Sequence, residues 1–301
     1  MASERTLFVT GASGHLGRRV VEILLEKGLG KIVAGTRKPE KLADLAARGV
    51  VVRQADFDDP KGLEAALAEV DRVLIISTDA IDRPGRRLKQ HQAAVAAAAS
   101  AGVKHVVYTS MPNPETSPVV FAPDHLGTEE ALKASGMGWT ILRDCWWIDY
   151  QIPTLASAVA SGKLISATGQ GGAPFVTRED CAHTCAAALA SEETSNKTWN
   201  ITGPDLVTYG ELAKLAGELS GRPVEFVAVT PEERTAQLIA GGTPEAIAKL
   251  LVSSQAAISQ GKMGTPTTAV KELTGRDPMS VREFLSAHRQ ALLPATQTAV
   301  R

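Results

Sequence analysis

A glycine-rich turn near the amino terminus has the composition of a phosphate-binding loop. The turn Gly11-Ala12-Ser13-Gly14-His15-Leu16-Gly17 follows an apolar segment and opens an apolar helical pattern. Gly11 permits a tight turn, Gly14 lets the backbone approach a pyrophosphate, and Gly17 allows a helix to pack closely on a strand. The helix N-terminus supplies N–H groups for the anion, so the strand–turn–helix context favours a dinucleotide over a ligand-free turn. The residues expected to contact it are Gly11, Ser13, Gly14, His15, Leu16 and Gly17.

The end of the second predicted strand distinguishes between the two nicotinamide dinucleotides. An enzyme that uses NAD carries an acidic residue about twenty positions after the turn, where it binds the ribose 2′-hydroxyl. This chain has Gly35-Thr36-Arg37-Lys38 instead. Arg37 can bind a 2′-phosphate in a forked geometry and Lys38 adds a second charge, so we predict NADP(H) rather than NADH. The alternative is that both cations are solvated at the start of a helix.

Two later strand ends are expected to complete the cofactor site. Asp56 and Phe57 follow the third predicted strand, and Ser77 ends the fourth. Ligands of parallel α/β sheets bind at the carboxyl ends of the strands. We therefore place Asp56 and Phe57 near the adenine, and Ser77 near the ribose or the nicotinamide.

The first half of the chain must form the scaffold for these residues. Apolar strands separated by helical patterns predict a doubly wound parallel sheet, a Rossmann fold, with both faces covered. The strands are expected at residues 7–10, 31–36, 50–54, 72–77, 104–109 and 139–143, with a helix near 128–135 before the last of them.

The second half has a looser pattern, with helices expected at 178–190, 209–220, 231–240 and 244–260. Ser280 and Glu283 have the spacing of a capping box at the start of a last helix. We predict a Rossmann domain at 1–145, a mostly helical substrate-binding part at 146–293 that is intertwined with it as a smaller α/β cap, and a flexible tail at 294–301.

Composition excludes several classes of protein. The formal net charge is −1, and a nucleic-acid-binding protein would need a basic face. We interpret the cluster Arg83, Arg86, Arg87 and Lys89 as the solvated start of a helix. No secretory or membrane-spanning pattern is present, which predicts a cytoplasmic protein. Cys181 and Cys185 lie one helical turn apart among alanines, so we expect packing thiols rather than a metal site.

The Gly-x-x-Gly-x-x-Gly spacing resembles the extended or atypical short-chain dehydrogenase/reductase superfamily. Its usual catalytic pair is Tyr-x-x-x-Lys, and the matching positions here are Phe121 and His125. Phenylalanine cannot transfer a proton. Ser110, at the end of the fifth predicted strand, is the conventional element that remains, and its hydroxyl is expected to bind a substrate carbonyl.

A narrower resemblance rests on two further segments, His125-Leu126-Gly127-Thr128-Glu129 and Thr140-Ile141-Leu142-Arg143-Asp144-Cys145-Trp146-Trp147. These are similar to the NmrA-like branch, in particular to type-2 NAD(P)H:quinone oxidoreductases and triphenylmethane dye reductases. The resemblance covers nearly the whole chain. Asp144 and Trp139 depart from the family's Asn and Tyr, and the tryptophan pair is bulkier than expected.

The resemblance implies a reductase of quinones or similar conjugated acceptors. A ketone builds up alkoxide charge and benefits from a proton donor, whereas a quinone gives a stabilised phenolate and a cationic dye becomes neutral. Met111, Trp146, Trp147 and Tyr150 are expected to bind the acceptor, although the aromatic residues could equally be ordinary core. His125 either orients the nicotinamide ribose or donates a proton, supported by Thr128 and Glu129, or it is a satisfied structural histidine at a helix start.

Two other functions remain open. NmrA-like proteins include redox sensors that bind a dinucleotide without turnover, and related isoflavone-type enzymes reduce C=C or ether bonds. The latter usually have lysine where this chain has His125. No metal, nucleic acid or membrane is expected as a partner, and the chain is predicted to be a monomer or a homodimer.

Overall fold

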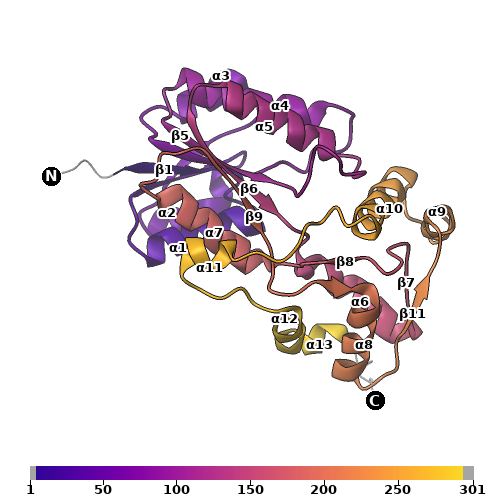
Figure 1. The fold of residues 1–301 in the computed structure, drawn as a ribbon. Coiled ribbons are helices and arrows are strands. Elements are labelled where there is room, and N and C mark those ends of the chain that lie inside the picture. Colours follow the sequence, from indigo (N-terminus) through magenta and orange to yellow (C-terminus); the bar gives the residue numbers. More distant parts are fainter. Residues whose placement is uncertain (1–4, 294–301) are drawn as a thin grey trace, which may run out of the picture.

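The computed structural model describes residues 5–293 and contains a seven-stranded parallel sheet between two helical layers (Figure 1). The strand order is β3-β2-β1-β4-β5-β6-β9, which confirms the predicted doubly wound Rossmann fold. The winding direction changes between β1 and β4, and ligands bind at such switch points. The strands are β1 (Thr6–Val9), β2 (Lys31–Thr36), β3 (Val51–Gln54), β4 (Arg72–Ile75), β5 (His105–Ser110), β6 (Gly138–Asp144) and β9 (Lys197–Ile201).

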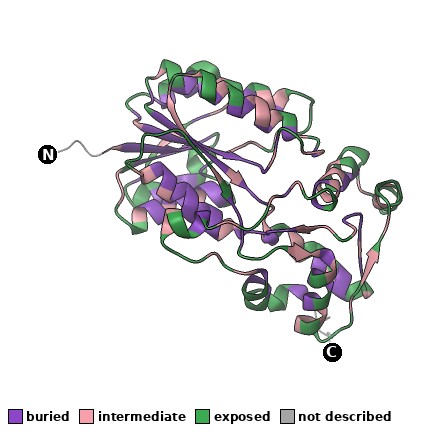
Figure 2. Cartoon of the chain, in the orientation of Figure 1, coloured by how far each residue is buried: buried purple, intermediate pink, exposed green. Residues whose placement is uncertain are grey.

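The two faces of the sheet are buried by different helices. One core joins the sheet to α1, α2 and α7, and a second core joins it to α3, α4 and α5. Because both faces are covered, the central strands are buried along their length (Figure 2). The helices are α1 (His15–Glu26), η1 (Pro39–Leu42), α2 (Ala43–Ala47), α3 (Pro60–Ala66), α4 (Arg86–Ser100), α5 (Ala122–Ala134) and α7 (Arg178–Ala190).

A smaller cap extends from the carboxyl end of β6. It holds two short sheets, β7 paired in parallel with β11 and β8 paired antiparallel with β10. Its strands are β7 (Lys163–Ser166), β8 (Gly172–Ala173), β10 (Val207–Thr208) and β11 (Glu225–Ala228). Its helices are η2 (Ile148–Gln151), α6 (Ile152–Ser161), α8 (Tyr209–Ser220), α9 (Pro231–Ala240), α10 (Glu245–Ser259), α12 (Val281–Ala287) and α13 (Arg289–Leu292).

The chain crosses between the two parts more than once. After β6 it builds part of the cap, returns to the sheet as α7 and β9, and then completes the cap (Figure 1). A further helix, α11 (Ala269–Thr274), packs against α7 and β9. Residues 146–293 therefore contribute two helices and a strand to the Rossmann part. The tail predicted at 294–301 lies outside the described residues.

Several local predictions are confirmed. The helices expected at 178–190, 209–220 and 231–240 have those bounds. Ser280 accepts from the Glu283 backbone N–H while the Glu283 carboxylate accepts from the Ser280 backbone N–H, which is the predicted capping box. Cys181 and Cys185 are free thiols packed in the core.

One boundary differs in a way that matters for the site. We expected a helix near 128–135, but α5 begins at Ala122 with Pro123 in its first turn. Proline is favoured there because its missing N–H has no helical partner to lose. The earlier start places His125 inside the helix and directs its ring into the core, where only 3% of the residue is exposed. Within residues 5–293, no helix is long and apolar enough to cross a membrane.

Candidate active site

The glycine turn has the geometry of an anion site. Gly11 has a positive φ of 59°, and the N–H of Gly14 donates to the carbonyl of Gly11 at 2.9 Å. A Cβ at Gly17 would lie 2.5 Å from that same carbonyl oxygen, so only glycine fits. Gly14 is the N-cap of α1 and has no side-chain cap, which leaves the first N–H groups of the helix without protein partners there. These donors fit a pyrophosphate.

The second strand supports the turn and ends in free cations. Thr36 donates through its hydroxyl to Ser13 Oγ at 2.9 Å, which ties the turn to β2. Arg37 and Lys38 follow Thr36, are exposed, and form no ion pair with any acid between residues 5 and 293. Two unpaired cations beside a phosphate-type turn fit a 2′-phosphate.

The adenine and ribose positions lie at neighbouring strand ends. Asp56 and Phe57 follow β3 and are half-buried, and Phe57 packs on the second core. Ser77 follows β4, where its backbone N–H donates to Thr109 Oγ1 at 2.9 Å. The order of the strands thus sets these residues along one edge of the sheet, as ligand binding across the switch point requires.

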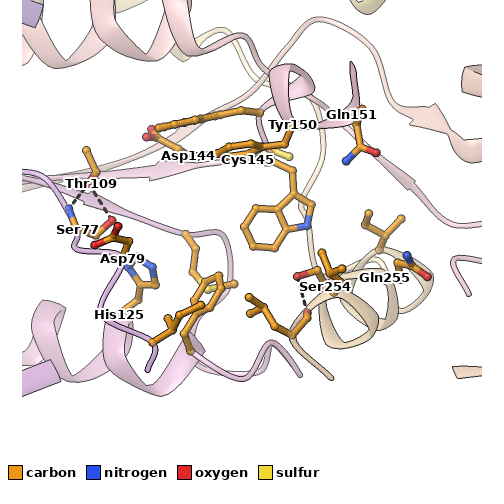
Figure 3. A pocket seen from close by; sticks show the side chains of 18 of the residues that line it. Ser77, Asp79, Thr109, His125, Asp144, Cys145, Tyr150, Gln151, Ser254 and Gln255 are labelled. Carbon is orange, nitrogen blue, oxygen red and sulfur yellow. Dashed lines mark hydrogen bonds between the residues drawn. The ribbon is translucent and has the colours of Figure 1, made fainter. Parts of the chain in front are cut away.

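A cavity of about 650 Å³ opens beside this edge, between the sheet and the cap (Figure 3). The strand ends after β4, β5 and β6 supply one wall, and α9 and α10 of the cap supply the opposite one. The sequence-predicted residues that line it are Leu16, Ser77, Ser110, Met111, His125, Trp146, Trp147 and Tyr150.

Ser110 has a different role from the one expected. Its hydroxyl donates to Glu129 Oε1 at 2.7 Å, and the Glu129 carboxylate pairs with Arg143 at 2.7 Å. Glu129 is fully buried, and Arg143 also pairs with Glu115. Because the hydroxyl proton points to Glu129, Ser110 offers lone pairs to the cavity and cannot at the same time donate to a substrate carbonyl.

His125 is a neutral acceptor. Nη2 of Arg87 donates to Nε2 of His125 at 3.0 Å, since a guanidinium has no acceptor atom. The imidazole proton is therefore on Nδ1 and is donated to the Tyr108 hydroxyl at 2.8 Å. Burial lowers the pKa of His125 well below its usual value, and the Arg87 charge lowers it further. Proton donation by His125, one of the roles we considered, does not fit this geometry.

The neighbours of His125 also differ from expectation. Thr128 was expected to support it, but Thr128 Oγ1 lies 3.0 Å from Nδ1 of His91 and donates to the Asp124 carbonyl at 2.6 Å. The other nitrogen of His91 accepts from the Thr78 backbone N–H at 2.9 Å. Burial lowers the pKa of His91 to about 3. A second neutral histidine therefore fills the core behind the cavity wall.

The interpretation of Arg87 as a solvated residue is wrong. Only 6% of Arg87 is exposed, and it lines the cavity, whereas its neighbour Arg86 pairs with Asp58 and Asp82 at the surface. Helical periodicity explains the difference, because consecutive residues face directions about 100° apart. The missed clue was the position of Arg87 on the same helix face as Gln90, His91 and Ala94, all of which are buried.

Phe121, which we expected at the position of the superfamily's tyrosine, lines the cavity. Its ring meets the ring of His125 edge-on at 5.7 Å and that of Trp146 at 6.1 Å. The Arg87 guanidinium lies 4.8 Å from the centre of the same ring. This wall is therefore apolar and cationic, and it carries no tyrosine hydroxyl at that position.

A flat aromatic surface forms another part of the cavity. The rings of Trp147 and Tyr150 stack at 5.5 Å with an interplanar angle of 14°. Arg178 lies 5.3 Å from the first ring and 5.5 Å from the second. Tyr150 remains 65% exposed and is not core, whereas Trp147 is half-buried and packs against the first core.

Asp144 ends β6 beneath the aromatic residues and lines the cavity. Burial raises the pKa of its carboxyl group well above the usual value, and Oδ1 has no hydrogen-bond partner among the described residues. Burial therefore favours the uncharged form of this group, which resembles the amide that the family has at this position.

The cap supplies lining residues that local sequence patterns did not indicate. They are Arg234, Leu238, Leu250, Leu251, Ser254, Gln255 and Ile258, from α9 and α10. No metal-binding cluster occurs within the described part of the chain.

Comparisons with known proteins agree with this geometry. Residues 11–192 match a family model described as NAD(P)H-binding. The chain is 33% identical to quinone oxidoreductase 2 of Escherichia coli K12 over 279 residues, which cover 92% of this chain and 96% of the relative.

Two solved structures are also similar along nearly their whole length. An NADPH-dependent quinone oxidoreductase from Escherichia coli, complexed with NADPH, has a TM-score of 0.89 and 32% identity, covering 94% of this chain and 99% of that one. The Citrobacter sp. triphenylmethane reductase complexed with NADP(H) has a TM-score of 0.87 and 33% identity, covering 93% and 99%.

Proposed function

Because the chain belongs to the NAD(P)H-binding family, we propose that it is an NADPH-dependent reductase of quinones or similar conjugated acceptors. The observation that carries this proposal is the cavity wall, which contains a stacked aromatic pair and Phe121, the residue expected at the position of the superfamily's proton-donating tyrosine. The names of the Escherichia coli and Citrobacter relatives support the same classes of acceptor.

The residues of the sheet edge would hold the cofactor. The glycine turn from Gly11 to Gly17 binds the pyrophosphate, Arg37 and Lys38 bind the 2′-phosphate, and Asp56 with Phe57 borders the adenine. Ser77 lines the edge of the cavity, where its hydroxyl would form a hydrogen bond with the ribose. When bound, the reduced nicotinamide supplies a hydride.

The cavity residues would position a flat acceptor. Trp147 and Tyr150 present their rings for stacking, while Met111 and Trp146 exclude water from the inner wall. Ser110 accepts a hydrogen bond through its lone pairs, since its proton is held by Glu129. His125 keeps its neutral imidazole fixed between Arg87 and Tyr108.

The missing tyrosine limits the acceptors that can react. A positioned proton donor contributes roughly 10²–10⁴-fold to reactions that need one. A simple ketone needs it because an alkoxide forms, whereas a quinone yields a delocalised phenolate and a cationic dye yields a neutral product. The wall around Phe121 therefore favours acceptors of the latter two kinds.

The test is a comparison of acceptors with the purified full-length chain. NADPH oxidation is followed with a benzoquinone, a cationic triphenylmethane dye and cyclohexanone, and NADH is tested in parallel. We expect turnover with the quinone or the dye, little with the ketone, and a preference for NADPH. Tight NADPH binding without turnover of any acceptor would contradict a reductase and indicate a dinucleotide sensor.

A further inference from the structure

Arg87 places a positive charge in the cavity wall without a carboxylate to neutralise it. The residue is 6% exposed and lines the cavity. Its Nη1 atom is buried and has no hydrogen-bond partner, and no acid between residues 5 and 293 forms an ion pair with it. Buried charges are normally paired, because removing them from water is unfavourable.

Three contacts hold the guanidinium in one orientation. Nε donates to the Thr78 carbonyl at 2.6 Å, and Nη2 donates to His125 Nε2 at 3.0 Å. The face of the group lies 4.8 Å from the centre of the Phe121 ring. His125 is itself fixed by Tyr108, which is fully buried. The charge is thus preorganised, with no side-chain ordering left to occur during a reaction.

The surroundings of Arg87 indicate what kind of anion could pair with its guanidinium group. Asp79 and Asp124 lie close enough to raise its pKa, although burial is the larger effect and lowers it. Neither acid forms an ion pair with Arg87 in the structure. Gly11 and Arg37, which are expected to hold the phosphates, do not line the cavity, whereas Leu16 of the same turn does. The candidate that is left to pair with Arg87 is an anion that forms in the cavity during the reaction.

Building on the proposed function, we propose that Arg87 is a catalytic residue that stabilises the negative charge developing on the acceptor oxygen. His125 is its positioning residue, which accepts from Nη2 and holds the guanidinium in the cavity wall, with Nη1 left without a partner among the described residues. This proposal gives a function to both unpaired Arg87 and neutral His125. It also replaces the missing tyrosine, because charge stabilisation requires no proton from the enzyme.

The reaction balances with the reduced nicotinamide dinucleotide as reductant. A C–H bond of that group breaks, and hydride carries two electrons and one proton to the quinone, which becomes a hydroquinone monoanion. The dinucleotide is oxidised by the same two electrons. The anionic oxygen pairs with Arg87 and then takes a proton from water, which gives the neutral hydroquinone.

A comparison of two acceptors tests this role. Arg87→Gln should lower kcat for a benzoquinone by about 10²–10³-fold, the effect of removing one oxyanion-stabilising donor. The same change should alter kcat for a cationic triphenylmethane dye by less than about threefold, because no anion forms when the dye accepts hydride. Arg86→Gln, on the same helix but at the surface, should leave both rates unchanged.

His125 is tested through the same ratio of rates. His125→Gln retains an acceptor for Arg87 and should preserve most of the quinone activity. His125→Leu removes the acceptor and should lower quinone turnover more than dye turnover. A merely structural role would lower both rates equally and would contradict the positioning assignment.

Two measurements separate the inference from the proposed function. The Kd of NADPH should stay within about twofold in Arg87→Gln, since the phosphates bind elsewhere. Suppose that the wild type reduces quinone, but that Arg87→Gln lowers kcat by the same factor for both acceptors or leaves both values unchanged. This inference then fails, while the proposed function stands. A wild type that reduces neither acceptor overturns both.

A binding experiment on the wild type requires no variant. In the presence of NADP⁺, pentafluorophenolate should compete with quinone at least about tenfold more strongly than uncharged pentafluorobenzene, because a charge-assisted contact forms. Equal inhibition by the two compounds would overturn the assignment of Arg87.

Discussion

Nε2 of His125 lies 3.0 Å from Nη2 of Arg87, and this contact determines the state of the imidazole. An arginine can only donate, so the nitrogen that faces it must be unprotonated. The ring is therefore a neutral link between a buried cation and the hydroxyl of Tyr108. The contact thus fits the proposed role of His125, which is to hold Arg87 in place without donating a proton.

We predict that His125 does not titrate in the physiological range. Because burial and the Arg87 charge lower its pKa, the ring should remain the neutral Nδ1–H tautomer from about pH 8 to 5.5. Nitrogen-15 NMR of the imidazoles checks this, with the His125→Gln spectrum used for assignment. Detection of an imidazolium at His125 above about pH 5.5 would contradict the buried contact.

Arg37→Glu should reverse the preference for the phosphorylated cofactor. An acid at this position repels a 2′-phosphate and can accept from a ribose hydroxyl. We expect kcat/KM for NADPH to fall at least about tenfold, while the value for NADH holds or rises. Steady-state kinetics with both cofactors measure the ratio, and the exposed Arg48→Glu serves as the charge-matched control. An unchanged ratio would show that the 2′-phosphate binds elsewhere.

Gly17→Ala should disrupt the turn. The new Cβ would lie 2.5 Å from the Gly11 carbonyl oxygen and 2.8 Å from its carbon, so the backbone must shift. A loss of about 1–3 kcal/mol in the free energy of unfolding is expected, together with weaker NADPH binding. Gly210→Ala is the control, since its Cβ meets nothing nearer than 3.8 Å. Urea unfolding and NADPH titration of both variants decide the point.

Trp147→Leu should weaken binding of flat acceptors. The substitution removes the ring that stacks on Tyr150 and faces Arg178. We expect the KM for a quinone to rise about tenfold, with a smaller change in kcat, because aromatic stacking contributes to binding the acceptor in both ground and transition states. Trp199→Leu removes a half-buried tryptophan of β9 outside the cavity and should leave KM unchanged. An equal effect of both substitutions would argue against an aromatic platform.

His105 should make stability depend on pH. Burial is the main cause that lowers its pKa from 6.5 to about 4 in the folded chain. Between these values the unfolded chain binds the additional proton, so the free energy of unfolding decreases as pH falls, by about 1.4 kcal/mol per unit. Asp144 acts in the opposite sense, because the folded state holds its proton.

The comparison of wild type with His105→Gln isolates this effect, since Asp144 is common to both. Urea unfolding is measured from about pH 8 to 4.5. The free energies of unfolding of the two proteins should differ by a constant amount above about pH 7 and should converge below about pH 6.5. Parallel curves throughout would mean that His105 is protonated or solvated in the folded state.

Local sequence patterns were sufficient for the nucleotide-binding half. Strands such as 31–36 are continuous apolar segments, and the glycine turn between a strand and a helix has few structural alternatives. These features depend on neighbours within a few residues. The same holds for the capping box at Ser280 and for the helix at 178–190.

The short strands of the cap depended on distant partners. β7 pairs with β11 more than fifty residues later, from Lys163 to Glu225 at its start, and each has four residues. Such segments carry little periodicity of their own, so pairing rather than propensity decides their structure.

What the sequence determined by itself was the glycine turn, the cations after β2 and the alternation of strands and helices typical of a Rossmann fold, because these follow from short-range geometry. The tertiary structure alone decided that Arg87 is buried, that Ser110 gives its proton to Glu129, and that His125 stays neutral. Each of those properties depends on which groups from other elements lie within hydrogen-bond distance and exclude water. That arrangement exists only after α4, α5 and the sheet have packed together.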